Sequence, residues 1–208
     1  YVAMTLKMIR EFGGKIRQDS PTLFTIPGRQ LYSAGTYRIE GDASSASYFW
    51  GAAAITGGKV KITNVGKDSI QGDARFPDIL EEMGARVRKG KDAIEVSGPL
   101  KKGIKVDLND MPDMVPTLAV CALFVPGRTV IVNVENLRYK ESDRLAAMAA
   151  ELKKLGANVE ELDDGLIIQG GELGGAEIET YNDHRIAMAF SLAGLRIPGI
   201  KIKNPECV

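Results

Sequence analysis

The sequence predicts an α/β fold built from a repeated unit of strand, helix, strand, helix, strand and strand. Glycines that end amphipathic helices recur 71 and 72 residues apart, at Gly13, Gly84 and Gly156. Two similar strand segments begin at Gly58 and Gly127, at about the same period. The first helix of each unit is mostly apolar, which predicts that these helices are buried together inside sheets. Because this period is too long for a solenoid, we expect a few units closed around a pseudo-threefold core.

One segment precedes the repeats. Residues 1–12 have the apolar spacing of a helix, which Gly13 and Gly14 end. We expect a short strand pair near residues 15–16 and 23–26, followed by a turn at Pro27 and Gly28. The sequence begins inside the expected helix and stops directly after an expected strand, which predicts a fragment of a longer protein.

Three repeat units follow, and the third is truncated. Alternating β-branched residues predict strands, whereas apolar residues three and four apart predict helices that end at Gly or Pro-Gly. The expected strands are 37–40, 60–65, 85–88, 93–96, 104–108, 129–134, 158–161, 165–168, 176–180 and 200–203. The expected helices are 46–55, 76–83, 114–125, one ending at Leu155, and 186–195.

Composition excludes several functional classes. The chain has 208 residues, 44% of them hydrophobic, which is typical of a soluble globular protein. Its 27 basic and 27 acidic residues give no overall field that would attract nucleic acid or an anionic membrane. No apolar run reaches the roughly 18 residues of a membrane span. Cys121 and Cys207 lack the spacing of a zinc or redox motif, which indicates a reduced, cytoplasmic protein.

A polar cluster stands at a helix start in every unit. Since the units repeat, we expect these starts to meet on one face of the domain. There the free backbone N–H groups and the positive end of each helix dipole would favour a bound anion. The clusters are residues 42–45, 110–113, 136–144 and 183–185.

The third cluster is the richest in charge. Lys140 and Arg144 are four residues apart, a spacing at which like charges on a helix repel by about 0.2–0.5 kcal/mol. We therefore expect a negative group between them. The alternative is a capping box with solvated charges.

Other residues in these clusters allow a structural and a functional interpretation. Asp113 and Glu141 are candidate acid–base carboxylates, although an acid in a first helical turn also favours the dipole. Ser44 or Ser45 is expected to cap its helix. His184, the one histidine, is either catalytic or a structural hydrogen-bonding group. The acidic residues and this histidine show no spacing typical of a metal site.

Four segments carry a family resemblance. Residues 40–49 (EGDASSASYF), 109–113 (NDMPD), 137–144 (LRYKESDR) and 180–185 (TYNDHR) resemble the 5-enolpyruvylshikimate-3-phosphate (EPSP) synthase family, in order and spacing. The resemblance runs the length of the chain but covers only the second half of the family's sequence. It implies an enolpyruvyl transferase-like, inside-out α/β barrel with three repeat units in each of two domains.

The resemblance also implies an activity. Enzymes of this family, in aromatic amino acid biosynthesis, transfer the enolpyruvyl group of phosphoenolpyruvate to the 5-hydroxyl of shikimate 3-phosphate. The reaction is an addition followed by elimination of phosphate, and it uses no metal or organic cofactor. The implied whole protein is a monomer that binds these two small molecules, without nucleic acid or membrane partners.

Matching positions carry implied catalytic roles. Asp113 would take the proton of the 5-hydroxyl, and Glu141 would assist proton transfer at the phosphoenolpyruvate methylene. Arg144 and Arg185 would hold the phosphate and carboxylate of phosphoenolpyruvate, with His184 beside them.

The implied contacts with shikimate 3-phosphate come from Tyr1, Asn136 and Lys140. The family's basic residues from the first half are absent, as is a lysine expected just after Val208. We therefore expect half an active site and an inactive fragment whose partner is the missing amino-terminal half. Residues 1–38 would belong to the other domain and residues 39–208 to the carboxy-terminal one. The unpartnered apolar face of residues 1–38 predicts low solubility or self-association.

Two other functions are open at this point. The related enolpyruvyl transferase that acts on UDP-N-acetylglucosamine shares the repeat fold, but the segments 140–144 and 181–185 argue against it. A non-catalytic domain that retains affinity for anions is the other alternative.

Overall fold

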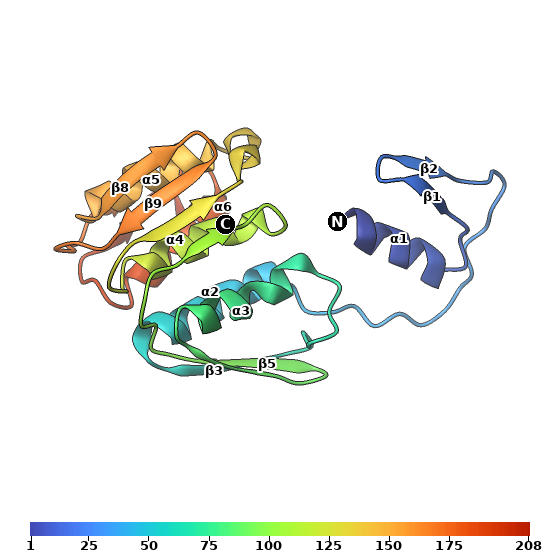
Figure 1. Ribbon diagram of the computed structural model, residues 1–208, viewed down its shortest axis with the longest axis horizontal. Coiled ribbons are helices and arrows are strands. Elements are labelled where there is room, and N and C mark those ends of the chain that lie inside the picture. Colours follow the sequence, from blue (N-terminus) through green and yellow to red (C-terminus); the bar gives the residue numbers. More distant parts are fainter.

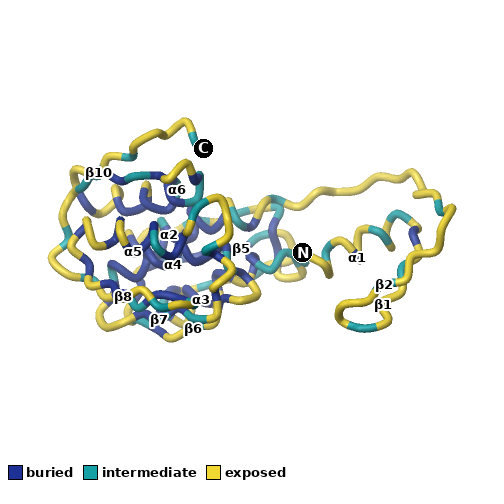
Figure 2. Tube along the Cα trace, turned by 90° about the horizontal axis from the view of Figure 1, so that it is seen from above, coloured by how far each residue is buried: buried dark blue, intermediate teal, exposed yellow.

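The computed structural model describes residues 1–208, which form two parts (Figure 1). Helix α1 (Val2–Glu11) and the hairpin of β1 (Arg17–Ser20) and β2 (Leu23–Thr25) stand apart from the rest. A segment without regular secondary structure, residues 26–42, leads from β2 into the larger part. That larger part contains the repeat units and nearly all of the buried residues (Figure 2).

Each unit contributes one sheet to the larger part. The first sheet has the order β3-β5-β4 and is antiparallel; the second, β6-β7-β9-β8, pairs β6 parallel with β7; the third pairs β10 parallel with β11. The strands are β3 (Lys59–Thr63), β4 (Arg86–Lys89), β5 (Ala93–Ser97), β6 (Lys105–Asp107), β7 (Thr129–Val132), β8 (Asn158–Leu162), β9 (Gly165–Gln169), β10 (Glu177–Ile178) and β11 (Lys201–Ile202).

The helices alternate with these strands as the sequence predicts. The α-helices are α2 (Ala43–Thr56), α3 (Phe76–Glu82), α4 (Val115–Ala122), α5 (Arg144–Lys154) and α6 (His184–Ala193). Short 3-10 turns precede or follow them, at η1 (Gly72–Arg75), η2 (Pro112–Met114), η3 (Glu135–Tyr139) and η4 (Pro205–Cys207). No helix is both long and apolar enough to cross a membrane.

The core is made by the first helices of the three units, α2, α4 and α6, which pack against one another. All eight residues of α4 are buried, and Trp50 and Phe190 are fully buried on its neighbours. A Cβ at Gly51 would lie 3.0 Å from the Thr117 methyl and 3.3 Å from the Cys121 sulfur. Small residues on α2 therefore let these helices approach closely, and the prediction of buried helices inside sheets is confirmed.

Several local predictions are confirmed, one is wrong, and one is displaced, since β1 begins at Arg17, just after the expected residues 15–16. Gly13, Gly84 and Gly156 all have positive φ, as expected of the residues that end these helices. The expected strand at 37–40 does not form. Ile39 is 79% exposed there, and Gly41 donates one backbone hydrogen bond to the Asn64 carbonyl. A single hydrogen bond does not make a strand ladder. The chain arrives here from the β1–β2 hairpin and does not run along the neighbouring sheet.

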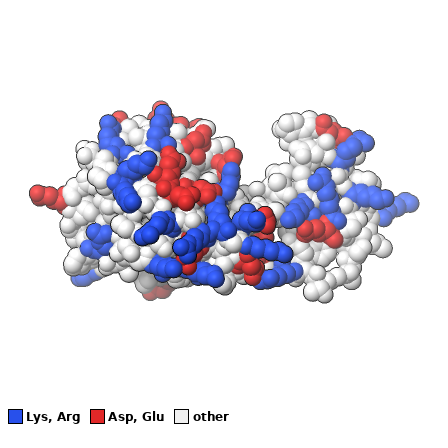
Figure 3. Space-filling model, turned by 60° about the horizontal axis from the view of Figure 1, so that its bottom comes forward, with Lys and Arg blue, Asp and Glu red and all other residues white.

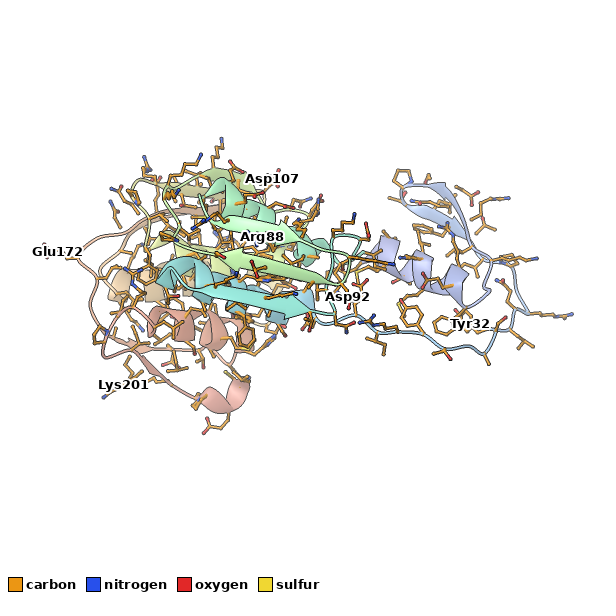
Figure 4. All side chains as sticks on the ribbon, turned by 90° about the horizontal axis from the view of Figure 1, so that it is seen from below. Tyr32, Arg88, Asp92, Asp107, Glu172 and Lys201 are labelled. Carbon is orange, nitrogen blue, oxygen red and sulfur yellow. The ribbon has the colours of Figure 1, made fainter.

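The surface agrees with the balanced charge of the sequence. Basic and acidic side chains are mixed over the visible face, and a notch separates the two parts (Figure 3). Asp92 lies in the turn between β4 and β5, at the end of the sheet nearest the smaller part, and pairs with Arg38 at 3.1 Å (Figure 4). Both members of this pair are well exposed, so it contributes little to stability.

The close approach of β7 and β9 gives a first prediction. A Cβ at Gly165 would lie 1.9 Å from the backbone oxygen of Ile131, so Gly165→Ala forces these strands apart. We expect a loss of about 1–3 kcal/mol in the free energy of unfolding. Thermal unfolding followed by circular dichroism measures it. Gly174→Ala is the matched control, because a Cβ at that position would have no atom within 4 Å and the φ of Gly174 is ordinary. Equal melting temperatures for the two variants would contradict the argument.

Candidate active site at the helix starts

An aspartate caps three of the helices whose starts carry the polar clusters. Asp42 accepts a hydrogen bond from the Ser44 N–H at 2.9 Å, Asp143 from the Ala146 N–H at 3.0 Å, and Asp183 from the Arg185 N–H at 2.9 Å. The prediction that Ser44 or Ser45 caps α2 is wrong. Because α2 begins at Ala43, both serines lie inside its first turn, where they cannot serve as the N-cap residue.

The Arg144 guanidinium joins three helix starts. Its side chain is 1% exposed. Nε donates to Asp183 Oδ2 at 2.8 Å, Nη1 to Asp113 Oδ1 at 3.1 Å, and Nη2 to Glu141 Oε2 at 2.6 Å. Asp113 precedes α4, Glu141 precedes α5 and Asp183 caps α6, so the expectation that these starts meet on one face is confirmed.

Asp113 is the negative group expected between Lys140 and Arg144. Besides Arg144, its carboxylate lies 3.8 Å from Lys140 Nζ and 3.1 Å from Arg185 Nη2, and it accepts a 3.2 Å hydrogen bond from the Tyr1 hydroxyl. The premise of like-charge repulsion along one helix is wrong, because α5 begins only at Arg144 and Lys140 lies before it. A carboxylate 27 positions away from Lys140 in the sequence therefore pairs with both cations.

The remaining predicted site residues lie at different distances from this network. Glu141 is half exposed and is the most accessible of the three carboxylates on Arg144. His184 begins α6, with Nδ1 3.9 Å from Asp183 Oδ1. Asn136 is exposed on η3 and makes no side-chain hydrogen bond to the other predicted residues. The structure therefore brings six predicted residues into one network, with His184 at its border and Asn136 outside it.

Burial and neighbouring charges shift the pKa values of several groups in this network. Burial alone would raise the pKa of Asp183, but the bonds from Arg144, the Arg185 N–H and Ser142 lower it below its usual value. Burial opposes the charged form of Arg185, yet Asp113, Tyr48 and Asp73 together outweigh this and raise the pKa of Arg185. Burial likewise raises the pKa of Tyr48, whose hydroxyl faces Arg185. Neighbouring groups of the network thus favour the charged forms of Asp183 and Arg185 despite their burial.

A cleft of about 690 Å³ lies between α1 and the helix starts. Its α1 side is apolar, and its other side carries acidic and basic groups. The lining residues from α1 and its cap are Tyr1, Met4, Met8 and Phe12, and those facing them include Asp42, Ser44, Gln71, Asp73, Pro112 and Arg185. A ligand of this cleft would meet an aromatic and methionine wall opposite charged side chains. No group of three His, Cys, Asp or Glu side chains is arranged to hold a metal ion.

Sequence reasoning misses two acids of this site. Asp183 lies in one of the predicted polar clusters, but its bond to Arg144 depends on packing between residues 39 positions apart. Asp73, on η1, is 9% exposed and accepts a hydrogen bond from the Ser44 hydroxyl. Burial and the nearby Asp113 raise its pKa, against the effect of Ser44. The one signal in the sequence is its position three residues before a helix, after Gln71 and Gly72.

Removing the Arg144 guanidinium gives a prediction for stability. Arg144→Met leaves Asp183 buried without its cation, which should cost about 3–5 kcal/mol in the free energy of unfolding. Urea unfolding at neutral pH measures this loss. Arg75→Met is the control, because Arg75 forms an exposed pair with Asp110 at 3.4 Å and should cost at most about 1 kcal/mol. A loss for Arg144→Met no larger than for the control would refute the assigned role.

Asp73 gives a prediction with the opposite sign. Its folded-state pKa is raised, so its contribution to stability is fully present below the unfolded pKa of about 3.9 and is lost as the pH rises through the folded value. Asp73→Asn keeps an acceptor for Ser44 and removes the charge. We expect it to raise the melting temperature at pH 7 and to leave it nearly unchanged at pH 3.5. The control is Asp68→Asn, an exposed carboxylate, with no change at pH 7. A lower melting temperature for Asp73→Asn at pH 7 would contradict this.

Comparisons with known proteins agree with this geometry. A family model described as EPSP synthase (3-phosphoshikimate 1-carboxyvinyltransferase) matches residues 1–208. Curated relatives named 3-phosphoshikimate 1-carboxyvinyltransferase include those of Serratia proteamaculans, 50% identical over 209 residues, and Nostoc punctiforme, 47% identical over 208. Each match covers 100% of this chain and 49% of the relative, so the chain spans about half their length.

A solved structure gives the same result. EPSP synthase from Acinetobacter baumannii superposes with a TM-score of 0.82 at 33% sequence identity, covering 97% of this chain and 50% of that one. This likeness confirms the predicted fold class, an α/β enolpyruvyl transferase-like barrel turned inside out. The match over every residue of the chain, with the helix starts joined as described, leads to one conclusion: the chain belongs to the EPSP synthase family.

Proposed function

We propose that this chain supplies about half of the active site of a 3-phosphoshikimate 1-carboxyvinyltransferase. The whole enzyme would transfer the enolpyruvyl group of phosphoenolpyruvate to the 5-hydroxyl of shikimate 3-phosphate and release phosphate. The observation that carries the proposal is the meeting of Lys140, Arg144 and Arg185 on the Asp113 carboxylate, beside a cleft that Tyr1 helps to line. Such cations suit a substrate pair with two phosphates and two carboxylates.

The catalytic roles that we propose are those that the family resemblance implies for the two half-reactions. In the addition, Asp113 would take the proton of the 5-hydroxyl as its oxygen bonds to C2 of phosphoenolpyruvate, and Glu141 would assist protonation of the methylene carbon. In the elimination, a proton leaves that methyl carbon as the C2–O bond to phosphate breaks. Arg144 and Arg185 would hold the phosphate and carboxylate and stabilise the tetrahedral intermediate. His184 would act beside them, and no metal or organic cofactor is part of the proposal.

Substrate binding would require an exchange of partners. Arg144 is 1% exposed and already donates to Asp113, Asp183 and Glu141. Asp183 is fully buried, whereas Glu141 is half exposed and can turn away. We propose that an anionic group of phosphoenolpyruvate, its phosphate or its carboxylate, replaces the Glu141 carboxylate on Arg144 Nη2. This exchange frees Glu141 for proton transfer. For shikimate 3-phosphate, Lys140, Asn136 and Tyr1 would provide contacts.

Residues 1–38 would belong to the other domain of the whole enzyme, and residues 39–208 to the carboxy-terminal one. Large apolar side chains of residues 1–38 are exposed, among them Leu31 at 90%, Ile26 at 62% and Leu23 at 59%. A surface of this kind is usually covered by a partner. We propose the part of the relatives that this chain does not match, their amino-terminal half, as that partner. The isolated chain would then be inactive and prone to associate. The cytoplasmic location and monomeric state of the whole enzyme stay predictions.

A second candidate is a non-catalytic anion-binding domain, which describes the isolated chain if it binds phosphate without turnover. The paired cations on Asp113 support this behaviour for the fragment alone. The alternative based on UDP-N-acetylglucosamine has no support here, because the relatives reported above carry the 3-phosphoshikimate name.

The test joins this chain to the unmatched part of the 50% identical Serratia relative. Calorimetric titration with shikimate 3-phosphate and phosphoenolpyruvate should give little or no binding for the 208 residues alone and clear binding for the joined protein. Phosphate release should appear only in the joined protein. Arg185→Gln should lower kcat/KM for phosphoenolpyruvate by about 100-fold or more, because it removes a charged donor to the developing anion.

Arg128→Gln is the control, since Arg128 is exposed and pairs with Glu160 on β8. It should change kcat/KM by less than about twofold, as surface pairs contribute little. Turnover by this chain alone would refute the half-site argument. A joined protein that folds but neither binds nor turns over these substrates would refute the proposed function.

A further inference from the structure

The loop that leads into α6 has an uncommon backbone. Tyr181 and Asn182 lie side by side in the left-handed region, with φ of 54° and 56°. Neither is glycine, and non-glycine residues keep this strained conformation only where the surrounding structure holds them. They directly precede Asp183, His184 and Arg185, so the loop's conformation sets where these residues point.

A buried carboxylate on another helix holds this loop. Glu151 of α5 is 0% exposed, which is rare for a glutamate without partners. Its Oε1 accepts the Tyr181 hydroxyl at 2.7 Å, and its Oε2 accepts the Glu179 N–H at 3.1 Å. Lys154 completes the group at 2.7 Å. Glu151 thus forms hydrogen bonds with the residues on both sides of Thr180.

The loop is fixed to α5 at two levels. At the helix start, Arg144 and Ser142 bond to Asp183 at 2.8 and 2.9 Å. Seven residues later, about two turns or 10 Å along the helix, Glu151 bonds to Tyr181. Tyr181, the first residue of the left-handed pair, makes one of these attachments, and Asp183, directly after the pair, makes the other. Loss of either attachment would let the strained pair relax and would move Arg185 relative to Arg144.

We propose that Glu151 and Tyr181 are positioning residues, whose buried hydrogen bond holds the loop that aims Arg185 at the anion site. The inference rests on the proposed function, in that the anion is taken to be phosphoenolpyruvate. Burial and the bond to Glu151 raise the pKa of Tyr181 to about 12, so the phenol stays a donor at any assay pH. Tyr181 is 41% exposed as a residue, so removal of its hydroxyl leaves no core cavity.

The chain offers a matched pair of variants. Tyr181→Phe removes the bond from the loop to Glu151 and keeps the ring. Lys154→Arg changes the other side chain on the same carboxylate but keeps its positive charge, and Lys154 makes no hydrogen bond or ion pair with the loop. In the joined protein, Tyr181→Phe should raise KM for phosphoenolpyruvate about tenfold, as is typical when a supporting partner is lost. KM for shikimate 3-phosphate should stay within about twofold, and Lys154→Arg should leave both constants within that range.

A second measurement needs no substrate. In this chain alone, the Asp183 N–H bonds to the Thr180 carbonyl at 2.8 Å and the Arg185 N–H to the Asp183 side chain at 2.9 Å. Hydrogen exchange of these two amides, read by NMR, should be about tenfold faster in Tyr181→Phe and unchanged in Lys154→Arg. The amides of α2 report on global unfolding and should exchange at the same rate in both variants.

The outcomes separate the two proposals. If the unmodified joined protein is inactive, the proposed function fails, while the exchange rates still decide the positioning role. If it is active and Tyr181→Phe matches Lys154→Arg in KM and in exchange, the positioning role is overturned. A uniform rise in exchange across α2 and the loop would also overturn it, because the bond would then serve only general stability.

Discussion

The bond between the buried Arg144 guanidinium and Asp183 holds the candidate site together. A charged group at 1% exposure is stable only where its partners are close and well oriented. Through its other nitrogens Arg144 also reaches Asp113 and Glu141, so one side chain ties the starts of α4, α5 and α6. The helices in turn can meet because their contact faces are apolar and small, as at Gly51. The helix packing that forms the core therefore also assembles the site.

The repeat explains why the polar residues gather where they do. Each unit places its first helix in the core and its sheet outside, so the helix starts must emerge on a common face. Two features of the sequence indicate this repeat: the spacing of Gly13, Gly84 and Gly156, and the apolar character of the first helices. Fold class, helix ends and the location of the polar face were all predictable for that reason.

The sequence could not reveal which charges pair. Asp113 neutralises Lys140 from 27 positions away, and spacing along one helix led to a repulsion that the structure does not contain. The expected strand at 37–40 was wrong for a related reason, since pairing depends on where the chain goes next. Asp73 was missed because its burial, rather than its place in a pattern, makes it unusual. Periodicity reports on single elements, whereas pairing and burial arise from contacts between them.

The internal neutralisation of Arg144 and Arg185 affects how the site would respond to salt. A cluster of free cations releases counterions when an anion binds, and its affinity then falls steeply with ionic strength. Here the carboxylates of Asp113 and Glu141 already serve as counterions. An incoming anion would displace a tethered carboxylate rather than dissolved ions, and the displaced group would remain within a few ångströms. The affinity of the site for an anion would therefore depend less on ionic strength than the number of cations suggests. The site would discriminate among anions by shape more than by charge.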